Sequence, residues 1–168
     1  QSGLTKGGRD AYLEGIIGGS QGITGLLGSV MYRDAAWHFA RLGRNLERAD
    51  MTTRIIDVRS TDLFDDDLAE SQSLDTLQWI SVLRSLSGYQ AYRRHIAMRV
   101  SRSEVLGFLF YDSEFPRSVL HCIDAVDESL GELENTGLPM RRAHTMKRRL
   151  KRTKVAELSQ ASLHDFID

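Results

Sequence analysis

Acidic and basic side chains recur at helical spacing between residues 47 and 57, where they could bind a metal, act on a substrate or neutralise one another. Glu47, Asp50, Arg54 and Asp57 follow a three-four rhythm that places them on one face of a helix. Di-metal carboxylate bundles also use Glu-x-x-His pairs, and the sequence contains none. Arg54 lies four residues after Asp50 and seven after Glu47, on the same helix face. We therefore favour a structural ion-pair network over a metal site.

Arginines close to these acids raise the alternative of an anion site. Arg48 lies about 100° from Glu47 round the helix, so the two neighbours should serve different partners. Arg117 falls at the start of a later expected helix, where the helix dipole disfavours a cation and an anion should lie nearby. We favour a salt bridge from Arg117 to Glu47 or Asp50 across the bundle, and the alternative is a bound phosphate or carboxylate.

A site for a small anion or a peptide carboxylate would combine Arg48, Arg54 and Arg117, with Arg44 on the same sector as Arg48. If the chain is an enzyme, Glu47 would serve as the general base, and Arg48 or Arg117 would hold the anion. These alternatives depend on how much water reaches the charged groups.

One long helix must position most of these groups. Asp34 is a suitable N-cap, and the helix should end near Arg59 or Ser60. Its expected apolar face holds Phe39, Leu42, Leu46, Ala49, Thr53 and Ile56. The next sector holds Ala36, Ala40, Gly43, Glu47, Asp50 and Arg54. A partner helix could approach closely over the small residues of this sector. We therefore expect its charges to be drawn partly out of water and paired there.

Helical periodicity and only two prolines predict an all-α fold, a single-domain helical bundle of about five or six helices. The expected domain spans residues 1–168, with a flexible N-terminus at 1–8, an acidic loop at 61–72 and a basic helix at 140–160. Between these segments we expect a glycine-rich helix at 9–31 and a helix at 74–98 capped by Ser73. A capping box at Ser101–Glu104 and a helix beginning at Pro116 should follow.

Two segments have a second interpretation. GGSQGITG at 18–25 could be a phosphate-binding loop, but no strand precedes it, so we favour close helix packing or a hinge. The basic residues at 141–154 could bind nucleic acid, but no aromatic residue interleaves with them. We favour a solvated face paired with acidic residues.

Composition limits the remaining classes. The net charge of −1 selects neither nucleic acid nor an anionic membrane. Cys122 is the only cysteine, which excludes an internal disulfide and indicates a reducing cytoplasm. His121 and Cys122 are neighbours on one helix and cannot converge on a metal, so we interpret Cys122 as a small core residue. No stretch is long and apolar enough to suggest a membrane span, and we expect neither a metal nor a cofactor.

Three segments together resemble the Alpha-E family, a bacterial all-helical domain defined by a Glu-Arg dipeptide. They are FARLGRNLERADMTTRIIDV at 39–58, QWISVLRSLSGYQAYRR at 78–94 and VLGFLFYDSEFPRSVLHCI at 105–123. The dipeptide here is Glu47-Arg48. Longer members carry the helix pattern twice and this chain once, so it resembles the C-terminal half of such a protein or a single-repeat form.

The resemblance also implies partners. The family occurs beside or fused to ATP-grasp-like peptide ligases and transglutaminase-like proteins. We therefore expect a non-catalytic helical module that docks an ATP-grasp-type amide ligase or presents its peptide substrate. The alternatives are an enzyme using Glu47 and Arg48 on a peptide or phosphorylated substrate, and a nucleic-acid binder through the basic helix. The chain could also form a homo-oligomer.

Overall fold

The computed structural model describes the backbone of residues 6–62 and 71–167. The described residues form eight α-helices and one short 3-10 helix and contain no strand, which confirms the all-α class. The chain divides into two compact units, residues 1–38 and 39–168, which are described in turn. The single domain expected over residues 1–168 stays a prediction.

The first unit contains α1 (Lys6–Val30) and the first turn of α2 (Ala35–Asp62). Residues 18–25 lie inside α1, so the phosphate-binding loop considered for this segment is wrong. Between the helices, the Asp34 carboxylate accepts a hydrogen bond from the Trp37 amide at 3.2 Å, which confirms the predicted N-cap. Of the expected flexible N-terminus, residues 1–5 lie outside the described residues and residues 6–8 are helical.

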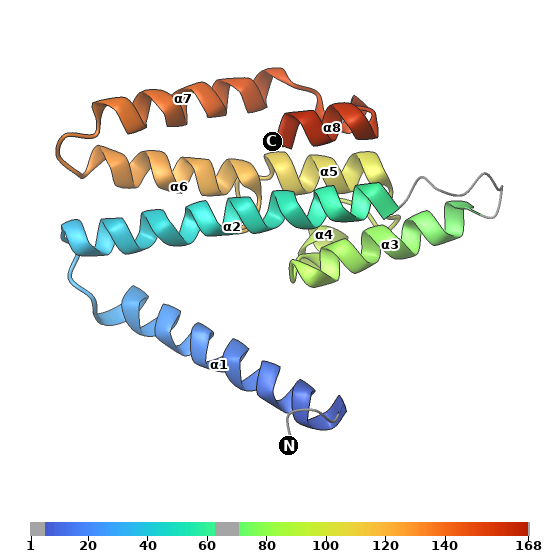
Figure 1. Ribbon diagram of the computed structural model, residues 1–168, viewed down its shortest axis with the longest axis horizontal. Helices are drawn as coiled ribbons and strands as arrows, with labels where there is room; N and C mark the ends of the chain where they lie inside the picture. Colours follow the sequence, from blue (N-terminus) through green and yellow to red (C-terminus); the bar gives the residue numbers. More distant parts are fainter. Residues whose placement is uncertain (1–5, 63–70, 168) are drawn as a thin grey trace. The chain divides into compact units, whose positions relative to one another are not determined.

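The second unit contains the rest of α2 and the helices α3 (Ser71–Ser85), α4 (Tyr89–His95), α5 (Arg102–Tyr111), α6 (Val119–Gly131), α7 (Gly137–Arg152) and α8 (Gln160–Ile167), with the 3-10 turn η2 at Val155–Glu157. In this unit α5 and α6 lie roughly end to end, with α2 along one side of the row and α7 and α8 along another (Figure 1). The core includes Ile56, Trp79, Leu83, Phe110 and Leu163, all at most 1% exposed.

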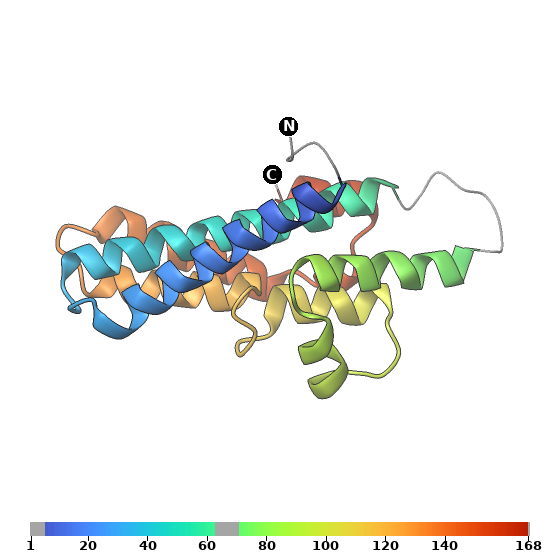
Figure 2. The ribbon, with the colours of Figure 1, turned by 90° about the horizontal axis from the view of Figure 1, so that it is seen from below.

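The expected helix over residues 74–98 is two helices. Ser87 adopts a left-handed φ of 55°, and the Gly88 amide donates to the Leu83 carbonyl while the Ser87 amide donates to that of Arg84. This hydrogen-bond pattern is a Schellman motif, which terminates α3. Figure 2 shows the chain turning sharply there into α4. A Cβ on Gly88 would lie 2.9 Å from Phe115, so the break allows close packing. Ser73 lies inside α3 and is not its N-cap.

The acidic loop expected at 61–72 falls largely on residues 63–70, which lie outside the described residues. Residues 61 and 62 belong to α2, and residues 71 and 72 belong to α3. The predicted helix end near Arg59 or Ser60 is therefore a few residues too early.

Hydrogen bonds from short polar side chains set the start of both helices in the α5–α6 row. Ser101 caps α5 and accepts from the Glu104 amide, as predicted. The helix expected from Pro116 begins at Val119 instead, because Ser118 accepts from the His121 amide and acts as the N-cap. The Asp112 carboxylate accepts from the amides of Glu114 and Phe115 at 2.8 Å each, which holds the preceding residues in a turn.

The basic helix, expected to span residues 140–160, ends at Arg152. The hydroxyl of Tyr111 donates to the Thr153 carbonyl and accepts from the Val155 amide at 3.0 Å. These bonds satisfy backbone groups outside the helix and seat Val155 in the core, where it is fully buried. The chain then continues through η2 into α8.

Candidate functional site

The Glu47-Arg48 pair on α2 is the candidate site, and its two residues face different environments. The buried face of α2 is centred on Asn45, Thr52 and Ile56, which are 3%, 1% and 0% exposed. At about 100° per residue, Glu47 lies about 200° from Asn45, and its side chain is exposed. The expectation that Glu47 is pressed into a crowded, paired environment is therefore wrong, because the charged sector of α2 points outward.

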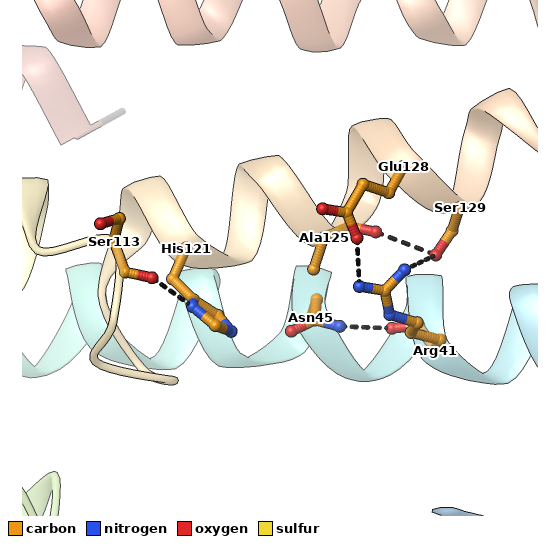
Figure 3. Close-up of polar contacts among 7 residues, drawn as sticks. All are labelled: Arg41, Asn45, Ser113, His121, Ala125, Glu128 and Ser129. Atoms are coloured by element: carbon orange, nitrogen blue, oxygen red, sulfur yellow. Dashed lines mark hydrogen bonds and ion pairs between the residues drawn. The ribbon is translucent and has the colours of Figure 1, made fainter.

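A polar seam joins α2 to α6. It consists of Arg41, Asn45 and Thr52 on α2, together with the residues they bond. Arg41 forms an ion pair of 2.5 Å with Glu128 and a hydrogen bond of 3.3 Å to Ser129 (Figure 3). The Asn45 amide donates to the Arg41 carbonyl at 2.8 Å.

Thr52 extends the seam toward the start of α6. Its hydroxyl donates a hydrogen bond of 2.8 Å to the backbone carbonyl of Arg117. This bond holds the turn before α6 against α2. It therefore brings Arg117 close to Arg48, which lies one turn before Thr52 on the same helix.

Arg44, Arg48 and Arg117 form a cationic cluster on one flank of the seam. Burial lowers the pKa of Arg48, and the nearby guanidiniums of Arg44 and Arg117 lower it further. Among the described residues, none of the three guanidiniums forms an ion pair or a hydrogen bond, and the Nε atom of Arg44 is buried without a partner. Three positive charges thus lie near one another beside the seam, and no carboxylate of the described residues pairs with them.

The expected salt bridges of Arg117 are absent from this arrangement. Glu47 and Asp50 lie on the exposed sector of α2, and Asp50 pairs with Arg54 at 2.8 Å along the same helix. That pair confirms the predicted neutralisation of Asp50 by Arg54, whereas the predicted contact of Arg54 with Glu47 does not form. Arg54 therefore lies on a different side of α2 from Arg48. The predicted site of Arg48, Arg54 and Arg117 is wrong in including Arg54. Its place beside Arg48 and Arg117 is taken by Arg44.

Three further acids on α2 and α6 lie beside basic side chains of α7 and α8. Asp57 lies 2.9 Å from the Nδ1 atom of His164 on α8. On α6, Asp124 pairs with Lys147 at 2.6 Å and Asp127 lies 2.9 Å from His144. The contact with Asp124 raises the pKa of Lys147. Two basic side chains of α7 therefore pair with acids of a neighbouring helix, as predicted for this segment.

Cys122 lies in the core beside the cationic cluster. Its side chain is fully buried, and burial raises the pKa of the thiol to about 11 even though Arg48 and Arg117 act in the opposite direction. Its neighbour His121 contacts the Ser113 carbonyl at 2.7 Å through Nδ1 (Figure 3). The prediction that Cys122 is a core residue and not a nucleophile is consistent with this environment.

The other flank of α2 lines an apolar groove of about 630 Å³ between α2, α6, α7 and α8. Its walls include Leu42, Leu46 and Ala49 of α2, Val126 and Leu130 of α6, and Met146 of α7. Most of the expected apolar face of α2 thus borders the groove and is not sealed in the core. Leu46 and Met146 remain 51% and 58% exposed.

Within residues 6–62 and 71–167, no group of three or more His, Cys, Asp or Glu side chains could hold a metal ion. No helix in the same part of the chain is both long enough and apolar enough to cross a membrane.

The fold and the site define an all-helical domain whose long second helix carries a Glu-Arg pair. A family model named Alpha-E, described as a predicted alpha-helical domain with a conserved ER motif, matches residues 2–168. The chain belongs to the Alpha-E family. Glu47-Arg48 is the only Glu-Arg dipeptide in the sequence and therefore carries the motif. No curated protein and no solved structure matched the chain.

The sequence interpretation missed Asn45 and Thr52, although a signal for both was present. With Arg41 and Arg48 they follow a spacing of four, three and four residues, which is the rhythm of a helix-packing stripe. Polar residues in that rhythm are uncommon at a helix interface, so the apolar stripe next to it was taken for the buried face.

Proposed function

We propose that the chain is a non-catalytic helical partner module of a peptide-ligating or peptide-modifying system. It docks an ATP-grasp-type amide ligase, or presents that ligase's peptide substrate, through the side of α2 that borders the apolar groove. A transglutaminase-like protein is the second kind of partner that the family resemblance implies. The observation that carries the proposal is the groove itself, which runs beside the family motif.

The groove has the chemistry of a helix-docking surface. An amphipathic helix inserts apolar side chains spaced three or four residues apart into such a groove. Leu46 and Met146 stand on opposite walls, and both are more than half exposed, at 51% and 58%. Arg142 on the α7 wall is exposed and can meet an acidic side chain on the polar flank of the incoming helix.

The alternative of an enzyme has less support. A general base needs a neighbouring group that orients it and a concave site that excludes water. Glu47 is exposed, does not line the groove and forms no ion pair or hydrogen bond with the described residues. It therefore lacks the surroundings that would distinguish a catalytic carboxylate from a solvated one.

Binding of nucleic acid through α7 also has less support. Lys147 and His144 already face the acids of α6, which reduces the charge that α7 can offer to phosphates. Arg141, Arg148 and Lys151 remain exposed on the helix. A cytoplasmic location is part of the proposal and is supported by the single, fully buried cysteine.

Affinity capture with a matched pair of variants tests the module. The full chain is used as bait in an extract of its own cells, and the recovered proteins are identified by mass spectrometry. Leu46→Asp places a charge on the groove wall, and Leu77→Asp makes the same change at a leucine of α3 that is 61% exposed and outside the groove. Both sites are exposed, so both variants should fold.

We expect the wild-type chain and Leu77→Asp to recover an amide-forming ATPase, and Leu46→Asp to lose it. Adding the purified chain should also raise the turnover of that ATPase with its peptide substrate. Recovery of the ATPase by Leu46→Asp would contradict docking through the groove, and recovery of no amide-forming enzyme by the wild-type chain would contradict the module.

A further inference from the structure

The cationic cluster formed by Arg44, Arg48 and Arg117 is independent of the groove. The groove lies on one flank of α2 and the cluster on the other, with Thr52 between them, and Cys122 of α6 borders both. No residue of the cluster lines the groove. A function of the cluster can therefore be tested separately from docking.

Three guanidiniums held together without a counter-ion are unfavourable unless something compensates for them. Arg48 is half-buried, and the Nε atom of Arg44 is buried with no hydrogen-bond partner among the described residues. A buried donor that is left unpaired costs free energy, and like charges in proximity add to that cost. The acids closest along α6 are already paired with Arg41, Lys147 and His144.

The surrounding backbone fixes the cluster in place. Arg117 immediately precedes Ser118, the N-cap of the 13-residue helix α6, and its carbonyl is held by Thr52 at 2.8 Å. The positive end of the α6 dipole adds to the field of the guanidiniums at this point. Arg44 and Arg48 are one turn apart on α2, so all three side chains project from anchored backbone.

We propose that Arg44, Arg48 and Arg117 form a binding site for a phosphate-class dianion, with Arg48 as its central ligand. Guanidinium groups bind phosphate and carboxylate oxygens through paired, charge-assisted hydrogen bonds. A phosphate monoester carries about two negative charges near neutral pH and three acceptor oxygens, so it matches three cations better than a single carboxylate does. The site assigns the arginine of the family motif to anion recognition and leaves the glutamate facing solvent.

Titration with inorganic phosphate tests the site. Backbone and arginine side-chain signals of the full chain are followed by NMR at constant ionic strength, with sodium chloride replaced stepwise by phosphate. We expect saturable shifts at Arg48, Arg117 and the first turn of α6. A parallel titration with acetate tests a carboxylate ligand. Acetate should bind at least about tenfold more weakly than phosphate because it carries half the charge.

Variants on α2 and before α6 provide the controls. Arg48→Gln and the exposed Arg117→Gln should each weaken phosphate binding by about tenfold or more, because each removes a charge-assisted pair. Arg54→Gln removes an exposed arginine from the outward sector of the same helix and should leave binding unchanged. Thermal unfolding of each variant, measured without phosphate, checks that it folds.

Three results would overturn the proposal. The first is a set of shifts that grow linearly without saturation. The second is equal loss of binding in Arg54→Gln and Arg117→Gln, which would indicate non-specific attraction. The third is tighter binding of acetate than of phosphate, which would replace the phosphate assignment with a carboxylate one. None of these results bears on the groove, and loss of docking in Leu46→Asp would leave the phosphate titration unchanged.

Discussion

Replacing Thr52 by valine tests the orientation of α2 on which the site depends. The Thr52 side chain is 1% exposed, and its hydroxyl donates a hydrogen bond of 2.8 Å to the Arg117 carbonyl. Valine has nearly the same shape, so the substitution removes the bond without creating a cavity. The carbonyl then loses its side-chain donor inside the seam. We expect the free energy of unfolding to fall by about 1 to 2 kcal/mol, which lowers Tm by about 3 to 8 °C.

Thr53→Val is the matched control for this substitution. Thr53 is the next residue of α2, and its hydroxyl bonds to the Asp50 carbonyl of its own helix at 2.9 Å. Removing that local bond should change the free energy of unfolding by less than about 0.5 kcal/mol. Urea unfolding followed by circular dichroism measures both variants. Equal stability of Thr52→Val and the wild type, or an equal loss in both variants, would refute the assigned orientation.

Further substitutions test neighbouring features of the second unit. Glu47→Ala should change the free energy of unfolding by less than about 0.5 kcal/mol in urea titrations, since Glu47 is exposed, and a loss above about 1 kcal/mol would show a buried partner. Gly88→Ala should lower stability by about 1 to 3 kcal/mol, because its Cβ would lie 2.9 Å from Phe115, and an unchanged Tm in calorimetry would contradict that contact. The thiol of Cys122 has an ordinary pKa of 9.0 that burial raises to about 11, so the unfolded chain loses this proton first as pH rises. The free energy of unfolding should therefore fall between pH 9 and 11, and should fall less in Cys122→Ala; identical pH profiles would exclude the effect.

Local capping could be predicted from the sequence because each cap depends on neighbours in the chain. Asp34 and Ser101 accept hydrogen bonds from amides three residues later, and those residues are visible in the sequence itself. Pro116 misled the prediction for α6, because the proline rule places a helix start without weighing the serine two residues later. Ser118 forms the cap there, supported by the turn that Asp112 organises.

The orientation of α2 could not be predicted in the same way. The apolar stripe through Leu42 and Leu46 is the stronger periodic signal, but most of it lines a groove. Thr52 is buried where its hydroxyl meets the Arg117 carbonyl, and Arg41 on the same side of α2 bonds to Ser129. Those partners lie more than sixty residues away in the chain, and only tertiary structure brings them together.

The orientation of α2 also decides which residue of the Glu-Arg pair is exposed. Sequence spacing correctly separated Glu47 from Arg48 and paired Asp50 with Arg54. Whether the sector of Glu47 or that of Arg48 faces the bundle depends on contacts with α6. The small residues before Glu47 suggested that its sector is buried, and it is exposed. Arg48 approaches Arg117 because Thr52 holds the turn before α6 against α2.

Thiol labelling gives the most direct test of the claim that the two sides of α2 differ as described. Glu47→Cys and Thr52→Cys are prepared in a Cys122→Ala background, and their reaction with a maleimide is timed under native conditions at pH 7.5. We expect the thiol introduced at Glu47 to react about as fast as a free thiol, and the thiol at Thr52 to be protected by orders of magnitude until the protein unfolds. Protection of the thiol at Glu47 together with rapid labelling at Thr52 would contradict this claim.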